Sequence, residues 1–139
     1  MAFDGTLIKV GAFATEVPTE YIEAKTYKAS PDQRMEWSAE RDATGVLHRE
    51  TVDNAPPKIE FTTISNLTNA EVVSLMNIFE SAFTDAKQRM LPVTFYDDAT
   101  GTYKTWNCYM PDVEFTISNV DKANRVITYE PIRFAFIGY

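Results

Sequence analysis

Residues 68–83 read TNAEVVSLMNIFESAF, and they decide the fold class because they are the one stretch that predicts a helix. Thr68 and Glu71 have the spacing of a capping box, in which each side chain bonds to the backbone of the other residue. Behind this cap, apolar residues recur at three- and four-residue spacing and form one stripe: Val72, Leu75, Met76, Phe79, Ala82 and Phe83. Such a stripe could bind a partner, but it is more typical of a helix laid across a sheet, and we expect the second.

β-rich segments, several of them with alternating polar and apolar residues, lie on both sides of this predicted helix. They fall at residues 6–10, 21–27, 34–52, 58–63, 93–96, 103–110, 113–117 and 126–137. Turn-forming residues separate them, as at 97–102 and 121–124. In the last segment Ile132, Phe134 and Phe136 fall on one face, which we expect to face the core. The expected fold is mainly β (α+β): a β-sandwich or open barrel of short antiparallel strands with one flanking helix.

Residues 34–52 predict a long β-hairpin with a polar tip. Before the turn, polar and apolar residues alternate, so that one face holds Met35, Trp37 and Ala39 and the other holds Glu36, Ser38 and Glu40. A period of two is typical of a half-buried strand. The turn follows at residues 42–45, Asp-Ala-Thr-Gly, and residues 46–52 run back. A long polar hairpin is a poor core element, and we interpret it as an arm that can reach a neighbouring subunit.

Length and composition indicate one folded domain over residues 1–139. A chain of 139 residues with 45% apolar and 13% aromatic residues has the usual size of a single domain and can build a core. The sequence has no internal repeat, low-complexity segment or linker. No apolar run approaches the ~20 residues of a membrane span. No signal peptide begins at Met1, so we expect synthesis in a cytoplasm.

The charge argues against nucleic acids and membrane surfaces as binding partners. The 20 acidic residues outnumber the 13 basic ones, which gives a formal net charge of −7. Phosphate binding needs clustered lysine and arginine, whereas the basic residues are dispersed along the sequence; carboxylates separate Arg34, Arg41 and Arg49. An anionic protein is also repelled by anionic lipids. We therefore expect no sequence-specific binding of nucleic acid and no membrane partner.

No residue pattern predicts catalysis, so we expect a protein that is not an enzyme and needs no cofactor or metal. His48, the only histidine, lies among charged residues on a predicted strand, which fits a solvated or interface position better than acid–base catalysis. Cys108, the only cysteine, is expected to be a small buried apolar residue. Asp97 and Asp98 are expected to form a turn, since the ligand spacing of a calcium loop is absent. A carboxylate pair for glycoside hydrolysis needs to meet only in space, so the sequence does not test that alternative.

Two stretches have a familiar order and spacing. One is RDATGVLHR at residues 41–49, a hairpin tip with a glycine turn, followed by a strand and the predicted helix. The other is VTFYDDATGTYKT at residues 93–105, followed by CYMPD at residues 108–112. Together they resemble short tail proteins of siphophages and prophages of gut and Gram-positive bacteria, many of which are known only as domains of unknown function. The resemblance covers residues 34–139, and Ala99 stands where those proteins carry a proline.

The resemblance implies a tail subunit similar to tail-tube, distal-tail and terminator proteins, with a small β-sandwich and one helix. It leaves open whether the subunit is a tube, terminator or baseplate-proximal ring protein of the virion tail. Such subunits assemble into rings, often hexamers, so the implied partners are further copies of the chain and other tail proteins. A ring joins two different patches of each subunit. We expect the hairpin to supply one of them, through Arg41, Asp42, Thr44, Gly45, His48 and Arg49. The acidity then fits passage of DNA through the lumen, because anionic walls repel phosphates.

The alternative is an accessory module of the baseplate that binds a host-surface receptor or a carbohydrate. Tyr96, Tyr103, Trp106 and Tyr109 lie in one predicted hairpin, where an exposed aromatic cluster would form a sugar-binding platform. On alternating strands about half of such residues face the core. Packing in the core or in an interface is therefore the preferred interpretation of these aromatic residues.

Overall fold

The structure is a computed structural model that describes residues 3–34, 36–51 and 55–139. Its strands are β1 (Ile8–Val10), β2 (Thr15–Glu16), β3 (Lys28–Ser30), β4 (Glu36–Arg41), β5 (Leu47–Thr51), β6 (Lys58–Thr62), β7 (Leu67–Thr68), β8 (Met90–Asp97), β9 (Thr102–Tyr109), β10 (Ile117–Asp121), β11 (Val126–Tyr129) and β12 (Arg133–Gly138). Its helices are the 3-10 helices η1 (Thr19–Tyr21) and η2 (Ala24–Thr26) and the α-helix α1 (Asn69–Ala82). The prediction of a mainly β fold with one flanking α-helix is confirmed over these residues.

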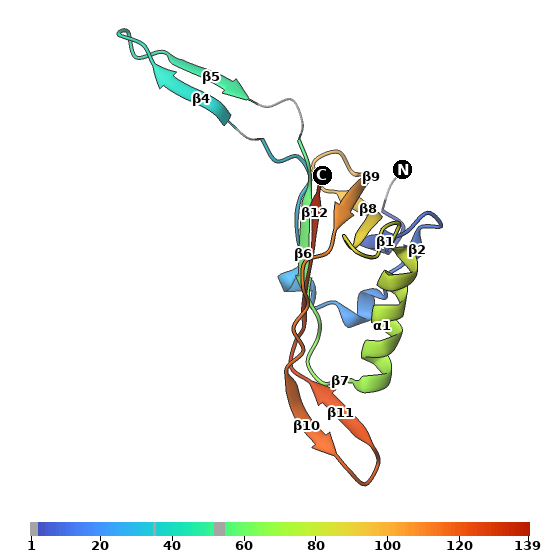
Figure 1. The fold of residues 1–139 in the computed structure, drawn as a ribbon. Coiled ribbons are helices and arrows are strands. Elements are labelled where there is room, and N and C mark those ends of the chain that lie inside the picture. The colour runs from blue at the N-terminus through green and yellow to red at the C-terminus, as the bar shows by residue number, and fades with distance from the viewer. Residues whose placement is uncertain (1–2, 35, 52–54) are drawn as a thin grey trace.

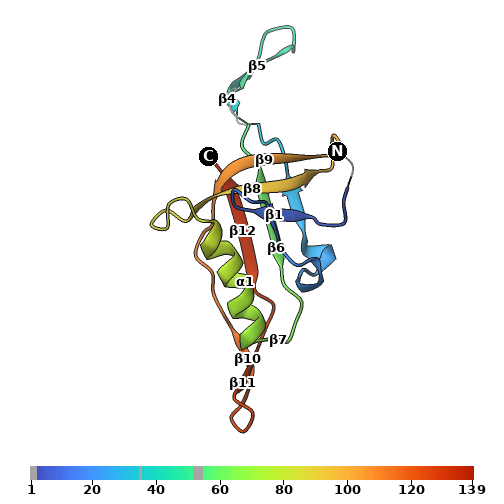
Figure 2. The same cartoon turned by 90° about the vertical axis from the view of Figure 1, so that its right-hand side faces the viewer.

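Seven strands form one antiparallel sheet in the order β2-β1-β8-β9-β12-β6-β3. Its longest ladder joins β8 to β9, from Met90 opposite Tyr109 to Asp97 opposite Thr102. The sheet twists strongly, so that β1, β8 and β9 run across the direction of β12 and β6 (Figure 2). Among the described strands, β2 and β3 remain as open edges, and the sheet does not close into a barrel.

The helix α1 begins where the sequence predicted and lies against one face of the sheet (Figure 2). The capping box is present: the Thr68 hydroxyl accepts a hydrogen bond from the Glu71 amide at 3.4 Å, and Glu71 Oε1 accepts one from the Thr68 amide at 3.1 Å. The predicted stripe turns inward, since Val72, Leu75, Phe79 and Ala82 are buried. Core packing is therefore the correct interpretation of the stripe. None of the described helices is long and apolar enough to span a membrane.

Aromatic rings join the helix to the sheet. The centroid of the Phe79 ring lies 5.0 Å from that of Phe134 and 5.4 Å from that of Phe136. Phe61 on the neighbouring strand β6 contacts the same two rings at 5.6 and 6.3 Å. The predicted core face of the last strand is confirmed, because Ile132 and both phenylalanines of β12 are at most 1% exposed.

The strand predicted at residues 21–27 is wrong. The chain forms the two short helices η1 and η2 here, with an isolated bridge at Ile22. The Thr26 hydroxyl donates to the carbonyl three residues earlier at 2.6 Å and accepts the Thr62 amide at 2.9 Å. This side chain therefore takes over bonds that a strand ladder would otherwise make.

Two predictions near the C-terminus also need correction. The strand predicted at residues 113–117 begins only with β10, and Phe115 is 44% exposed and packs on Tyr129 outside the core. The strand predicted at residues 126–137 is divided into β11 and β12. Pro131 lies between them and has no amide hydrogen to continue a ladder, which explains the division.

Two hairpins project from opposite ends of the molecule (Figure 1). The β4–β5 hairpin forms a two-stranded sheet of its own. The β10–β11 hairpin joins β7 in a three-stranded sheet at the other end. The molecule is therefore elongated, with its core between α1 and the seven-stranded sheet.

Replacing Thr68 with alanine is expected to lower the free energy of unfolding by about 1 kcal/mol, because the Glu71 amide loses its side-chain acceptor. Urea denaturation followed by circular dichroism measures the change. Ser74→Ala is the matched control: Ser74 is exposed in the same helix, away from its end, and alanine favours helix there. Equal losses in the two variants would contradict a capping role for Thr68.

Candidate functional site

The β4–β5 hairpin, which we call the arm, stands away from the rest of the chain (Figure 1). Every side chain at residues 38–50 is exposed. These include two apolar side chains near the tip, Val46 at 55% and Leu47 at 43% exposure. The arm therefore buries none of these side chains within its own chain.

The prediction of a half-buried strand in this hairpin is wrong for Ala39, which is exposed. Met35 and the side chain of Trp37, which were expected on the same face, lie outside the described residues. Alternation shows which residues share a face, but a face is buried only where another element packs on it. No described element of this chain packs on the Ala39 face.

Asp42 organises the tip of the arm. One carboxylate oxygen accepts hydrogen bonds from the Thr44 amide at 2.9 Å, the Thr44 hydroxyl at 2.6 Å and the Val46 amide at 3.1 Å. The other oxygen lies 2.9 Å from His48 Nε2. Gly45 has a φ of +87°, a left-handed conformation that glycine adopts without strain. The tip thus holds its shape through its own contacts.

The structure brings most of the predicted interface residues together at this tip: Arg41, Asp42, Thr44, Gly45 and His48. Arg41 completes the group, since its Nη1 donates to the Gly45 carbonyl at 2.9 Å. Arg49 lies farther along β5, opposite Ala39. All of these residues are exposed, and their contact with another subunit stays a prediction.

The strand register separates the charges of the arm onto two faces. Opposite residues of an antiparallel pair project to the same side of the sheet. One side, which we call the acidic face, therefore holds the pairs Ser38–Glu50 and Glu40–His48, and the other holds Ala39–Arg49 and Arg41–Leu47. The sequence interpretation did not assign Glu40 and Glu50 to the site. The position of the turn in the sequence implies this register, so the sequence could have placed both glutamates on one face.

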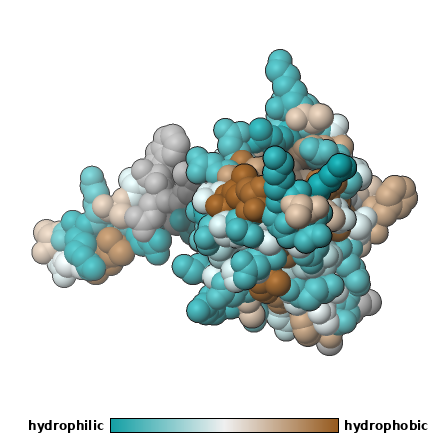
Figure 3. All heavy atoms as spheres, turned by 90° about the horizontal axis from the view of Figure 1, so that it is seen from below, coloured by the Kyte–Doolittle hydropathy of each residue, from teal (hydrophilic) through white to brown (hydrophobic). Residues whose placement is uncertain are grey.

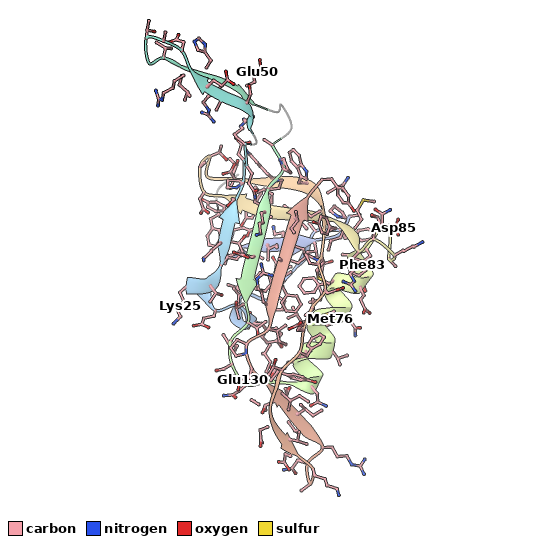
Figure 4. All side chains as sticks on the ribbon, turned by 60° about the vertical axis from the view of Figure 1, so that its left-hand side comes forward. Lys25, Glu50, Met76, Phe83, Asp85 and Glu130 are labelled. Carbon is pink, nitrogen blue, oxygen red and sulfur yellow. The ribbon has the colours of Figure 1, made fainter. Side chains whose placement is uncertain are left out.

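A second candidate surface lies on the open face of the sheet, on β3, β6 and β12. It is a hollow of about 410 Å³, which we call the basic hollow, lined by Lys25, Thr26, Lys28, Glu60, Phe61, Thr62 and Arg133. Figure 4 shows Lys25 projecting from η2 beside this face. Arg133 pairs with Glu60 at 2.5 Å and lowers the pKa of that carboxyl group. The buried neighbours of Glu60 on β6 point toward α1, so Glu60 points away from the core.

Apolar side chains are exposed at the end of the molecule that carries β10 and β11. Figure 3, which looks at this end, shows brown patches between polar side chains. Ile117 is 51% and Val120 is 60% exposed. A groove of about 320 Å³ beside α1 is lined in part by Val73, Phe115 and Tyr129. Nothing in the structure shows what covers this groove.

The aromatic residues of the β8–β9 hairpin do not form one exposed cluster. Tyr96 and Tyr103 form an edge-to-face pair with centroids 5.7 Å apart. Trp106 lies opposite the buried Val93 and so faces the core, on the other side of the sheet from that pair. Its indole nitrogen donates to the carbonyl of Tyr139 at 3.0 Å. Trp106 therefore does not lie on the same face as Tyr96 and Tyr103, as a shared sugar-binding platform would require.

The cysteine and the aspartate that were considered for chemistry, Cys108 and Asp97, have structural roles in the core and in a turn. Cys108 is buried, as expected, and burial raises the pKa of its thiol to about 12. Asp97 forms the predicted turn, because its carboxylate accepts the Ala99 amide at 2.9 Å and pairs with Lys104 at 2.6 Å. In the part of the chain that the structure describes, no three histidine, cysteine or acidic side chains gather as a metal site requires. The absence of an enzymatic role stays a prediction.

Asp42 is expected to titrate below the usual range of aspartate. Hydrogen bonds from Thr44 and His48 lower its pKa from 3.8 to about 2. The tip contacts should therefore be complete above pH 3.8 and be lost as the pH falls through about 2. Thr44→Val removes the hydroxyl donor and should raise the pKa, whereas Thr100→Val in another turn should not. An NMR titration of the Asp42 carboxyl carbon measures both, and the same pKa in both variants would contradict this account.

A family model matches the chain over its whole length. No curated protein matches the chain. Residues 1–139, the whole chain, match the family described as "Family of unknown function (DUF6711)". That description names no phage and no tail, so it agrees with the resemblance only as far as a domain of unknown function. On this match, the chain belongs to the DUF6711 family.

Proposed function

We propose that the chain is a structural subunit of a bacteriophage tail, a tube, terminator or baseplate-proximal ring protein that acts by self-assembly. The observation that carries the proposal is the arm. It extends over residues 36–51, and its side chains from residue 38 to residue 50 are exposed. In the described part of the chain no other element packs on these side chains, and contact with a neighbouring subunit would give the arm a function.

Physical arguments favour such a contact. A two-stranded hairpin alone in water is at most marginally stable. Both outer edges of the arm present unpaired backbone groups, which readily pair with another chain. The tip is already held in shape by Asp42, so binding would order fewer groups and lose less entropy. The arm thus has the properties of an assembly element.

The proposed contact is compatible with a ring. An arm that docks on the body of a neighbour joins two different patches, and such contacts can repeat from copy to copy until the rotation closes. The preference for a ring over a two-fold dimer that exchanges arms comes from the resemblance. The choice of a hexamer, the location in the virion tail and the contacts with other tail proteins rest on the resemblance alone.

Passage of DNA through the ring is part of the proposal. The net charge of −7 makes the protein as a whole repel phosphates. An anionic wall lets DNA slide past without adhering. A strongly basic inward surface in an assembled ring would contradict this part.

Removal of the arm is expected to abolish assembly and leave the body folded. The Gln33 amide donates to the Pro56 carbonyl at 3.4 Å, so a short Gly-Ser linker can replace residues 35–53. Size-exclusion chromatography with light scattering should give a molar mass of several subunits for the natural chain and the mass of one subunit for the variant. Negative-stain images of the natural chain should show closed rings.

Thermal unfolding is the control for this experiment. The armless variant should still unfold in one cooperative thermal transition, because the packing of Phe79 on β12 is untouched. Its Tm should equal that of the natural chain at a dilution at which the natural chain is monomeric, since assembly itself raises the Tm. A natural chain that stays monomeric at every concentration would refute the proposed function. An armless variant that assembles like the natural chain would refute the role of the arm.

A further inference from the structure

The basic hollow is an exception to the acidity of the chain. Lys25, Lys28 and Arg133 supply three positive charges around it, against one negative charge from Glu60. Arg133 is far from Lys25 and Lys28 in the sequence, and the pairing of β3 with β6 and of β6 with β12 brings it to them. A protein with a net charge of −7 therefore carries a locally positive, concave surface.

The positive charges of the hollow are only partly compensated within the chain. Arg133 pairs with Glu60. Lys25 lies 3.3 Å from Glu23, but its side chain is 81% exposed, and exposed pairs of this kind hold weakly. Lys28 lies opposite Glu60 and its charge contributes to the lowered pKa of that carboxyl group, but no described carboxylate forms an ion pair with Lys28. The hollow can thus accept further negative charge.

The acidic face of the arm offers that charge. Glu40 and Glu50 are exposed and have no ion-pair partner in the described part of the chain. Figure 4 shows Glu50 on the arm, well away from the body that carries Lys25. The six residues of β4 span ~20 Å at ~3.3 Å per residue, so the tip of the arm lies about this distance from the point where the arm leaves the body. The two surfaces are therefore free to meet on different copies.

We propose that the acidic face of the arm of one copy docks on the basic hollow of the next copy. This proposal rests on the proposed function, because it names the surface that receives the arm. The occupant is a second copy of the chain, since one sequence supplies both complementary charges. The opposite face of the arm carries Arg41 and Arg49, which the hollow repels, so the charges also fix which way the arm turns.

Charge-swap variants test the pairing. Glu40→Lys with Glu50→Lys should weaken association at least about tenfold, and Lys25→Glu with Lys28→Glu should do the same. A one-to-one mixture of the two variants should assemble almost as the natural chain does. In that mixture each reversed arm meets a reversed hollow, and each natural arm meets a natural hollow. Sedimentation velocity measures association at one fixed salt concentration.

The mixture also guards against misfolding, since variants that cannot fold would not assemble together. Glu80→Lys with Asp98→Lys is the matched control for the arm swap, because both residues are exposed, both lie outside the two surfaces, and the two substitutions raise the net charge by the same amount as the arm swap does. This control should associate like the natural chain. Weakening as strong as that of the arm swap would show a general charge effect and overturn the pairing.

The remaining outcomes separate this inference from the proposed function. Loss of assembly in both swap variants without recovery in the mixture overturns the pairing. Unchanged assembly in the swaps, together with a monomeric armless variant, overturns the pairing and leaves the proposed function in place. A natural chain that never associates overturns both. Binding of a short DNA duplex that Lys25→Glu with Lys28→Glu abolishes, with assembly unchanged, would assign the hollow to nucleic acid instead.

Discussion

The fold depends on one contact, the packing of Phe79 on α1 against Phe134 and Phe136 on β12. All three side chains are fully buried. The apolar face of a sheet has to be covered by another layer, and α1 is the helix of the described chain that covers it (Figure 2). Because the core lies between helix and sheet, the hairpins at the two ends have little core of their own. The side chains of the arm are exposed because the arm extends beyond the end of this core.

Local signals predicted the features that depend on local physics. The capping box at Thr68 and the apolar spacing behind it placed α1 correctly, and the turn at Asp97 placed the hairpin of β8 and β9. The segment at residues 21–27 has β-forming residues, but the Thr26 hydroxyl donates to a nearby backbone carbonyl. This side-chain bond competes with the backbone bonds of a strand, and the amino-acid composition of the segment does not show it. The exposure of Ala39 was not predictable, because alternation does not show whether another element packs on that face.

The candidate site was predictable at the tip of the arm and not beyond it. The residues from Asp42 to His48 are close in sequence, so their turn chemistry can be read directly. The basic residues were expected to be dispersed, and along the sequence they are. The fold nevertheless gathers Lys25, Lys28 and Arg133 into one hollow through strand pairings that no local pattern encodes. The receiving surface is therefore a tertiary property.

The basic hollow also constrains the proposal about DNA. In the proposed ring, an uncovered hollow on the wall of the lumen would bind phosphates through Lys28 and would retain the DNA. An arm docked there places Glu40 and Glu50 against these cations and removes that attraction. The contact that would build the ring would thus also leave the remaining surface with its acidic excess. The net charge of the chain does not distinguish these surfaces, whereas the positions of the charges do. In the proposed assembly, the passage of DNA would therefore depend on the docking of the arm.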